Sequence, residues 1–538
     1  MFKRFKNALL TSKKQTVSTV IISLIMAVLY FVCIHFRDFD TITGMYASSE
    51  TALKYVLKII ILAVILFLCI NAVRVFFTLR GEKIGKESGR KHRLFFFGSW
   101  AFIVGAYMVW LLGTYPGSAN PDSELQFRYY LGLTPWSMWH PPLSSFLMGS
   151  LYSIGKAIAN PNFGFFLYQL LQTIVAGAIF SYAMTKLVRL GISKIYAAIG
   201  IAFYSLVPMF GAYAAWVEKD FLFAAVFVLF VTMLVDVVLK KSISVWQMVS
   251  ISAVSVLCSM LRNNGIYALF PALLVLMFIL KGRNRWRIFI CMVALVGIYG
   301  CFTKVIFPRN GIASTSVSEV IGVTFQQTAR YVNTYPEEVT EEQKEIIAKN
   351  FQSYEVMKNY DPKINDPVKI YYNHSDPKGY FKVWGQMLIK HPLTFVASYV
   401  NGAYGYLAPV KAETGVYINS RYDGFLADEL GLKDGVKPET RQRFINYLNG
   451  SSVKFPTKYL NMPGLYTWVL ISMMLIVGGS RKKEMLVLFI PSFVTLLVCT
   501  VSPLACAMRY ALPIVLATPL LVGVATLSYK KGEKSESK

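Results

Sequence analysis

Apolar residues recur along this chain in long runs that are separated by short polar segments. Most runs hold about 18–20 residues, the length that an α-helix needs to cross roughly 30 Å of hydrocarbon. Hydrophobic residues make up 55% of the 538 positions, as repeated burial in lipid requires. The runs predict an all-α polytopic membrane protein with about 12 transmembrane helices, near residues 17–36, 54–74, 94–113, 162–185, 195–213, 221–239, 244–261, 265–280, 287–306, 463–480, 485–502 and 510–528.

The positive charge of the chain is concentrated on one side of these runs. Lys and Arg number 55 against 29 Asp and Glu, a net charge of +26 that by itself would suit nucleic acid. The basic residues gather at the N-terminus and in the short loops after even-numbered spans, which is the positive-inside pattern of membrane proteins. We therefore expect anionic lipid headgroups as the partner and no nucleic acid. Both termini should face the cytoplasm.

Two segments depart from the pattern of spans. Residues 141–158 are short and begin with two prolines, and counting them as a span would reverse every later loop. We interpret them as an interfacial helix on the outer face. Residues 307–460 are polar and extracytoplasmic in this topology, with a charged helix expected over 340–358 after a Thr cap. The expected regions are a two-span N-terminal region (1–93), a core membrane module (94–306), the extracytoplasmic region (307–460) and a three-span C-terminal region with a cytoplasmic tail (461–538).

Several familiar site types are excluded. The seven cysteines lie in or beside apolar runs and none falls within 307–460, so neither a disulfide framework there nor a cysteine zinc site is expected. The chain carries no phosphate-binding glycine loop of the Walker type and no metalloprotease motif. The first apolar run lacks a small-residue cleavage site and reads as a retained anchor.

Charged residues from separate parts of the chain converge at the outer ends of the predicted spans. Polar groups in hydrocarbon are expensive, so such residues are usually functional or hydrated. Each alone has an ordinary explanation: a helix cap, an arginine that extends to the headgroups, or an interfacial histidine. Their convergence on one face is the stronger signal. The residues are Asp122, Glu124, His140, Glu218, Lys219, Asp220, Arg262 and Arg509.

Carboxylates and cations at an outer membrane face suit a reaction of a lipid-linked phosphate. Arginine and lysine stabilise the charge that develops on a leaving phosphate. A positioned carboxylate removes the proton from an attacking hydroxyl. Because the donor's energy arrives in the lipid, such an enzyme needs no nucleotide-binding motif.

The layout resembles the GT-C superfamily of integral membrane glycosyltransferases, which use polyprenyl-phosphate or polyprenyl-diphosphate sugars. The resemblance covers residues 94–306 well and the remainder loosely. In two GT-C branches the first acidic motif is Asp-Glu, whereas Ser123 intervenes here, and two extra spans precede the core. Together with Arg509-Tyr510, the matching segments are also similar to DUF6020, an uncharacterised bacterial membrane family. These segments are Pro121-Asp122-Ser123-Glu124, His140-Pro141-Pro142-Leu143, Glu218-Lys219-Asp220 and Leu261-Arg262-Asn263-Asn264-Gly265-Ile266-Tyr267.

The resemblance implies a GT-C-like fold and an inverting glycosyltransferase of the bacterial plasma membrane. It would move a sugar from a polyprenyl-phosphate donor to an extracytoplasmic glycan or lipid-linked acceptor. Asp122, expected to stand exposed near the headgroup plane, would be the base, and Asp220 with Glu218 would orient the acceptor or hold a cation. No cofactor is certain, but Mg²⁺ or Mn²⁺ is an expectation, with Asp122 and Asp220 as its ligands. The expected substrate-binding residues are Glu124, His140, Lys219, Arg262, Asn263, Arg509 and Tyr510, and Trp136, Trp139, Tyr213 and Trp216 are candidates for stacking on sugar rings or for the interfacial aromatic belt.

Two other functions fit the same outer charges. A flippase or transporter of lipid-linked glycans would hold its charges in a central cavity beside broken helices, and Gly265 could mark such a break. A polymerase or ligase of lipid-linked glycans would share the outer-face chemistry. A purely structural protein would have no need for converging carboxylates and cations.

Overall fold

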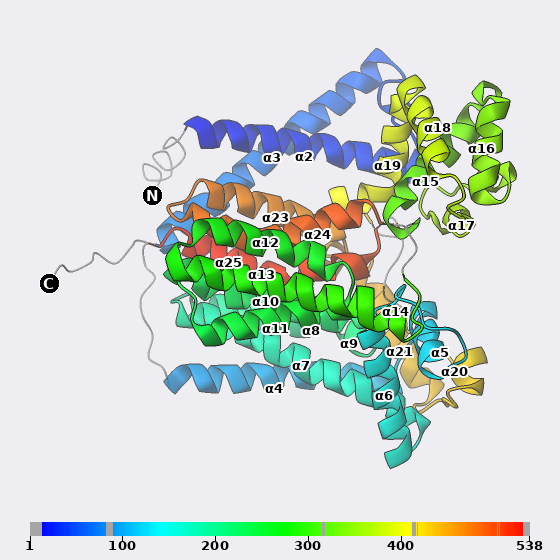
Figure 1. Ribbon diagram of the computed structural model, residues 1–538. Helices are drawn as coiled ribbons and strands as arrows, with labels where there is room; N and C mark the ends of the chain where they lie inside the picture. The colour runs from blue at the N-terminus through cyan, green and yellow to red at the C-terminus, as the bar shows by residue number, and fades with distance from the viewer. Residues whose placement is uncertain are drawn as a thin grey trace.

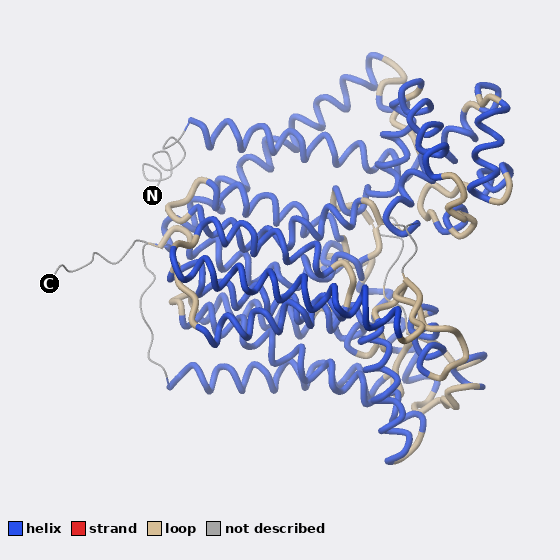
Figure 2. The backbone as a smooth tube through the Cα atoms, viewed as in Figure 1, coloured by secondary structure: helices blue, strands red, loops and turns tan. Residues whose placement is uncertain are grey.

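The computed structural model describes residues 13–81, 90–314, 318–411, 416, 418–502, 504 and 506–530. Within these ranges every regular element is a helix, and the β contacts are isolated bridges (Figure 2). The basic residues before residue 13, in 82–89 and after residue 530 lie outside the described residues, so their part of the predicted orientation is not addressed.

Long apolar helices form the body of the molecule (Figure 1). Eight described helical stretches are long and apolar enough to cross a membrane, and the bent pair α8–α9 makes a ninth. Three shorter apolar helices lie at the remaining predicted runs, and this set of helices confirms the all-α polytopic membrane fold. The helices are α2 (Lys13–Phe39), α3 (Ser49–Gly81), α4 (Arg90–Gly113), α7 (Pro161–Arg189), α8 (Lys194–Leu206), α9 (Pro208–Ala214), α10 (Lys219–Lys240), α11 (Val245–Leu261), α12 (Gly265–Ile279), α13 (Gly282–Cys301), α23 (Pro463–Gly478), α24 (Ile490–Thr500) with the preceding turn η5 (Lys483–Phe489), and α25 (Met508–Leu527).

Two of these helices, α10 and α25, form the centre of the bundle. Their most apolar stretches are 78% and 83% buried, whereas that of α3 is only 11% buried. A helix that is apolar on every side belongs in a core, and α10 between Phe221 and Val238 is almost unbroken in Phe, Val, Leu and Ala. The central pair therefore supplies a rigid frame for whatever stands at its ends.

The two ends of the bundle differ. The start of α2, the end of α25 and the loops after α7, α10 and α12 lie at one end, here called the terminal end (Figure 1). At the other, here called the site end, α4 finishes and α10 and α25 begin. Short helices and the polar region cover the site end: α5 (Pro121–Tyr130), α6 (Pro142–Ile158), α14 (Phe307–Arg309), α15 (Ser318–Thr334), α16 (Glu341–Phe351), α17 (Asp366–Lys369), α18 (Pro377–Lys390), α19 (Pro392–Leu407), α20 (Gly424–Asp428), α21 (Pro438–Ser451) and α22 (Thr457–Leu460).

Helix α6 has the features of the expected interfacial helix. It is steeply inclined to the bundle helices (Figure 1) and buries one face that includes Ser145, Met148 and Tyr152. Phe146 and Ile158 remain exposed on the other side. Such a two-faced helix suits the boundary between hydrocarbon and headgroups.

The polar region 307–460 is divided into two parts. Residues 318–407, with α15 to α19, surround a core of their own that includes Phe325, Phe351 and Tyr380. Residues 418–451, here called the cover segment, pack elsewhere: Leu426 and Leu430 join Phe127 and Tyr152 beside α5 and α6, and α21 lies against α4 and α9. The first part is a small lobe, and the second is an extension of the site end.

The charged helix expected over 340–358 is shorter than predicted. Thr340 caps α16 with a reciprocal pair of hydrogen bonds to Gln343, as its sequence indicates. The helix ends at Phe351, where Gln352 takes a positive φ of 66°. Ser353 then accepts a hydrogen bond from the backbone N–H of Glu355 at 3.1 Å and starts a separate turn, η4 (Tyr354–Asn359). A competing cap thus divides the charged stretch.

Candidate active site

Two loops that carry the acidic motifs are bound side by side at the site end. The N–H of Ser118 donates to Ala215 O at 3.0 Å, and the N–H of Val217 donates to Ser118 O at 2.8 Å. The Ser123 hydroxyl also donates to Val217 O. These bonds place the first turn of α5 next to the start of α10, so Asp122 and the Glu218-Lys219-Asp220 motif become neighbours.

Helix α5 starts where the sequence signals a start. Asn120 accepts a hydrogen bond from the backbone N–H of Ser123 at 2.8 Å, and Pro121 occupies the first helical position. Both are favourable at a helix N-terminus. Asp122 follows in the first turn, where a carboxylate also interacts well with the helix dipole.

Asp122 makes an ion pair with Arg509, the second residue of α25. The Arg509 guanidinium lies 2.6 Å from the Asp122 carboxylate, and the ammonium of Lys219 lies 4.0 Å away. Burial alone would raise the pKa of Asp122, but the charges of Lys219 and Arg509 outweigh it and hold that pKa below its ordinary value. The expectation of an exposed, unsupported Asp122 was therefore wrong: its side chain is 33% exposed and belongs to a charged network.

Glu218 caps α10 and neutralises Lys219. Its carboxylate accepts from the backbone N–H of Asp220 at 3.0 Å and lies 3.0 Å from the Lys219 ammonium. Burial opposes ionisation of Glu218, yet Lys219 and these hydrogen bonds hold its pKa well below the ordinary value. With no exposed surface, Glu218 is a structural anion that orients Lys219.

Asp220 is paired with Arg262, deeper in the protein than the Asp122–Arg509 pair. Their side chains are in contact, with 1% of Asp220 and 12% of Arg262 exposed. The Arg262 guanidinium also lies 4.9 Å from the ring centre of Tyr510, an arrangement in which the ring face attracts the cation. Arg262 therefore does not extend to the headgroups, and Asp220 orients Arg262 and is shielded from any acceptor.

His140 and Asn263 stand beside the charged groups. Burial and then Lys219 lower the pKa of His140 to about 3, so its imidazole is neutral at neutral pH. The Asn263 amide donates to Met138 O at 2.8 Å. This bond fixes the loop that leads to His140. The Tyr510 hydroxyl accepts a hydrogen bond from the Arg509 guanidinium at 3.1 Å and so orients it.

Some predicted residues are not brought to the cluster. Glu124 lies nearer Arg128 and Asp423, and burial raises its pKa. Tyr213 and Trp216 are 2% and 3% exposed within the apolar core, so neither alternative, stacking on a sugar or a place in the interfacial belt, holds for them. Two other aromatic candidates remain more open: Trp136, which is half-buried and stacks on Tyr129, and Trp139, which is 50% exposed and stacks on His140.

Charges within the cluster balance. Three carboxylates face three cations, in the pairs Asp122–Arg509, Glu218–Lys219 and Asp220–Arg262. In the described part of the chain no three His, Cys, Asp or Glu side chains are grouped as a metal ion would need. Asp122 and Asp220 each face a guanidinium, so this arrangement does not fit a Mg²⁺ or Mn²⁺ site built on them.

Sequence reasoning missed residues that hold the site from behind. The Gln172 amide donates to Ala214 O at 2.8 Å and to Trp216 O at 2.7 Å, and the Tyr168 hydroxyl donates to Glu218 O at 3.1 Å. Arg441 of the cover segment, only 1% exposed, donates to Tyr115 O at 2.7 Å. Glutamines within apolar run 162–185 were a usable signal, whereas Arg441 lies in a charged stretch that reads as a hydrated helix.

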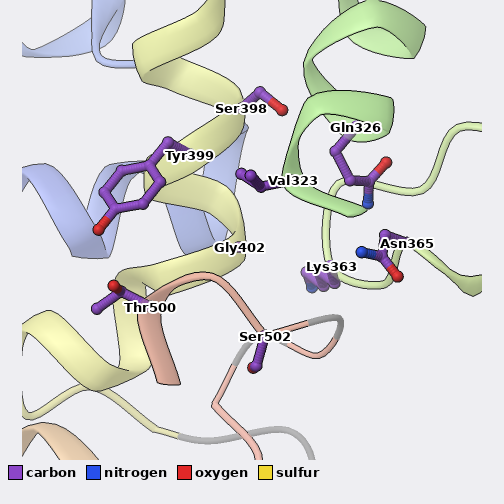
Figure 3. A pocket seen from close by; sticks show the side chains of 9 residues that line it. All are labelled: Val323, Gln326, Lys363, Asn365, Ser398, Tyr399, Gly402, Thr500 and Ser502. Atoms are coloured by element: carbon purple, nitrogen blue, oxygen red, sulfur yellow. The ribbon is translucent and has the colours of Figure 1, made fainter. Parts of the chain in front are cut away.

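A small pocket lies apart from the cluster, between α15, α19 and the residues that follow α24 (Figure 3). Its lining is mixed, and the side chains of Asn365 and Ser398 each have a buried oxygen without a hydrogen-bond partner among the described residues. Thr500 and Ser502 close it on the side of the bundle. It contains none of the predicted site residues, and water suits its unpaired oxygens.

Comparison with known proteins places the chain in a family. Residues 134–538 match DUF6020, described as a family of unknown function. The chain belongs to the DUF6020 family. The match confirms that part of the resemblance, but it extends to the C-terminus instead of concentrating on residues 94–306. It includes every paired residue of the cluster except Asp122, which precedes the DUF6020 region.

One solved structure is also similar. ArnT from Cupriavidus metallidurans, bound to undecaprenyl phosphate, has 14% sequence identity, with 79% of this chain and 77% of that chain covered and a TM-score of 0.31. A TM-score this low carries no argument about this DUF6020 protein. No similar curated protein was found.

Proposed function

We propose that the protein is a membrane glycosyltransferase that moves a sugar from a polyprenyl-phosphate donor to a hydroxyl of a cell-envelope glycan. The reaction takes place at the site end, on the extracytoplasmic face of a bacterial plasma membrane. The observation that carries the proposal is the cluster in which Lys219 and Arg509 both approach the Asp122 carboxylate, within 4.0 and 2.6 Å.

The depth of this cluster suits a lipid phosphate. Lys219 and Asp220 are the first two residues of α10, and Arg509 is the second residue of α25. The charges therefore lie at the level where these two central spans begin. A lipid phosphate is held at the same level, between hydrocarbon and water. Arginine and lysine placed there stabilise the negative charge that the phosphate gains as it leaves.

The donor phosphate has to compete with Asp122. All three cations are already neutralised, and Asp122 has the most exposed side chain of the six charged groups, whereas Glu218 and Asp220 are almost fully buried. The phosphate therefore takes the place of Asp122 at Arg509 and Lys219. This exchange releases the Asp122 carboxylate beside the bound donor, where a base is needed.

The transfer itself then requires few protein groups. The acceptor oxygen forms a bond to the anomeric carbon while the bond from that carbon to the phosphate oxygen breaks. Polyprenyl phosphate leaves with the bonding electrons, and Asp122 takes the acceptor's proton. Attack opposite to the leaving phosphate inverts the anomeric centre. Asp220 and Tyr510 hold Arg262 behind the phosphate, and neutral His140 lies at the side.

One feature of the structure favours a flippase, but the charged residues do not lie where a flippase would need them. Helices α8 and α9 are a broken span, bent by 58°. The break is lined by apolar residues such as Val207, Met209 and Phe210, all buried in the core. A transporter would place its charges at such a break, whereas here they stand at the site end.

A transfer assay tests the proposal. Purified protein in lipid vesicles is given synthetic polyprenyl-phosphate sugars and cell-envelope glycan acceptors, and products are identified by mass spectrometry. The expected product carries one new glycosidic bond, with release of polyprenyl phosphate. Transfer of whole lipid-linked chains would assign a polymerase or ligase instead, and movement of intact lipid-linked glycan across the vesicle would assign a flippase.

The proposed face is tested by thiol labelling in intact cells. Ser375, exposed in the lobe at the site end, and Ser242, exposed after α10 at the terminal end, are each changed to Cys. A membrane-impermeant reagent should label Ser375→Cys and leave Ser242→Cys unlabelled. The reverse pattern would place the cluster in the cytoplasm and contradict the proposal.

A further inference from the structure

The cover segment is bound to the loop that leads into Asp122. Asn419 accepts from the backbone N–H of Ala119 at 2.8 Å, and the N–H of Asn419 donates to the Ser118 hydroxyl at 3.2 Å. The Tyr422 hydroxyl donates to Gly117 O. The partners are about 300 residues apart in the sequence, so this is a tertiary contact and not a local turn.

Arg441 lies at the centre of this contact between the cover segment and the 114–119 loop. It donates to Tyr115 O at 2.7 Å, to Asn419 O at 3.1 Å and to the Tyr422 hydroxyl at 3.0 Å. Its guanidinium also lies 4.9 Å from the ring centre of Tyr422, and the carboxylate of Asp434 is 3.8 Å away. A single buried guanidinium thus joins both sides of the contact, which only the forked donors of arginine can do at once.

The hydrogen-bond directions are consistent. Burial raises the pKa of the Tyr422 hydroxyl to about 12, even though Arg441 acts against this. The hydroxyl therefore stays protonated, accepts from Arg441 and donates to Gly117 O. Gly117 has a φ of +123°, and a Cβ there would meet the Gln169 side chain at 2.0 Å, so the loop has one tightly defined path.

The loop is held from its other side as well. Gln169 donates to Pro116 O at 2.6 Å, and Ser118 is paired with the 215–217 loop. Residues 114–119 therefore lie between the core of the bundle and the cover segment. Asp122 follows three residues later, so the position of its carboxylate against Arg509 and Lys219 depends on both sides of this contact.

We propose that Arg441 is a positioning residue, and that the cover segment serves to hold the 114–119 loop so that Asp122 meets Arg509 and Lys219. The inference rests on the proposed function only in giving Asp122 the role of base. Arg441 itself touches no group of the charged cluster. It acts through the loop, and this gives the polar region 418–451 a function in catalysis.

Loosening the loop has different consequences for the two halves of the site. Asp122 withdraws from Arg509 and Lys219, so its pKa rises towards the ordinary value and its geometry as a base is lost. A misplacement of about 1 Å commonly costs up to roughly 100-fold in rate. The cations themselves are carried by α10 and α25, so the donor phosphate still binds, and it binds more tightly because the competing Asp122 carboxylate has withdrawn.

The test compares Arg441→Met with Arg421→Met. Arg421 is an exposed arginine of the same segment and is paired with exposed Asp423, so its change removes one positive charge at a distance from the loop's hydrogen bonds. Both are made in a background in which the exposed Cys69 and Cys301 are replaced by serine and Ser118 is changed to cysteine. Ser118 is 2% exposed, so labelling of this cysteine reports release of the loop without any need for activity.

The expected result separates the variants. In Arg441→Met the cysteine at 118 is labelled at least tenfold faster than in the parent, whereas in Arg421→Met it stays protected. The kcat for sugar transfer falls roughly 10–100-fold in the original serine background, and the acidic limb of kcat/KM moves to higher pH. The Kd for geranyl phosphate becomes lower, because Asp122 competes less for Arg509 and Lys219. A merely structural defect would lower the rate equally at every pH.

Other outcomes would refute the role of Arg441, or would separate that role from the proposed function. If labelling is equally slow in Arg441→Met and in the parent, Arg441 does not hold the 114–119 loop, whatever the activity. Arg441→Lys, which keeps the charge, guards against misfolding: a lysine variant with normal labelling but the full loss in kcat also refutes that role. If the parent protein transfers no sugar, the proposed function fails, while the labelling result still decides whether Arg441 holds the loop.

Discussion

Helix α10 carries an aspartate near each end, and the two have very different surroundings. At the terminal end, Asp236 pairs with Lys186 of α7, with 20% and 11% of the side chains exposed. At the site end, Asp220 pairs with Arg262, and two more ion pairs stand within reach. The helix has 22 residues, so about 33 Å separates its ends.

The difference shows what each end is for. A single, partly hydrated pair between neighbouring helices contributes little to stability and requires little of its surroundings. Several buried pairs in contact are expensive to desolvate, and apolar residues of similar size would often be more stable. A protein keeps such a cluster where the charges are used, which is why the site end and not the terminal end is assigned to chemistry.

Removing the most exposed carboxylate should give the largest effect. Asp122→Asn keeps the shape and the hydrogen bond to Arg509 but accepts no proton, so turnover should fall roughly 10²–10⁴-fold. The Kd for geranyl phosphate should instead become lower by roughly tenfold, about 1.4 kcal/mol, because the competing charge is gone. Isothermal titration and the transfer assay measure the two quantities on the same preparation.

The matched control is Asp236→Asn at the terminal end of the same helix. It removes the same charge from an ion pair that is far from the cluster, so turnover and phosphate binding should both stay normal. An Asp122→Asn protein that binds geranyl phosphate more weakly than the parent would show that the phosphate does not replace the carboxylate.

The two arginines should differ in what their loss changes. Arg509→Ala leaves Asp122, which is partly exposed and can hydrate, so the fold survives and phosphate binding weakens by about 2–5 kcal/mol. Arg262→Ala leaves Asp220 buried and unpaired, which should lower the free energy of unfolding by about 3–5 kcal/mol. Thermal unfolding in detergent and phosphate titration distinguish the two effects.

A double substitution sharpens this prediction. Arg262→Met with Asp220→Asn removes both charges and should recover most of the stability lost in Arg262→Ala. Lys186→Ala, the equivalent change at the terminal end, leaves a partly hydrated Asp236 and should cost far less. Equal losses of stability in Lys186→Ala and Arg262→Ala would erase the distinction between the two ends.

The smallest expected effect is in the pH dependence. In the free protein Lys219 and Arg509 hold the pKa of Asp122 below its ordinary value. Bound phosphate shares these cations and adds negative charge, so the pKa of Asp122 rises in the complex. Because kcat/KM reports the free enzyme and kcat the complex, the acidic limb of kcat should lie at higher pH than that of kcat/KM. Coincident limbs, or the reverse order, would contradict the exchange.

Much of the fold could be predicted because the membrane imposes length and polarity on each span. Apolar runs gave the twelve helices, and the loops gave the ends at which Asp122, Lys219, Arg262 and Arg509 meet. The pairing within the cluster could not be predicted, since it depends on the packing of α10 against α25. Tyr213 and Trp216 were misjudged because span-end aromatics can point to the core as well as to the interface.

The cover segment was beyond sequence reasoning for a different reason. Most of its contacts use backbone groups of the 114–119 loop, the carbonyls of Tyr115 and Gly117 and the N–H of Ala119, and almost any residue type supplies these. Arg441 stands among Glu439, Gln442 and Arg443, a composition typical of a hydrated helix. Only the tertiary structure shows that this one arginine is turned inward.

The separation of Asp122 and Arg509 along the chain also governs when the site comes into existence. They are 387 residues apart, and at about 5–20 residues per second a ribosome needs roughly 20–80 s to go from one to the other. Until α25 is inserted, the earlier spans hold three carboxylates and only two of the cations. If the proposed function holds, the donor phosphate has no complete site on a nascent chain, and the protein becomes active only once α25 is inserted.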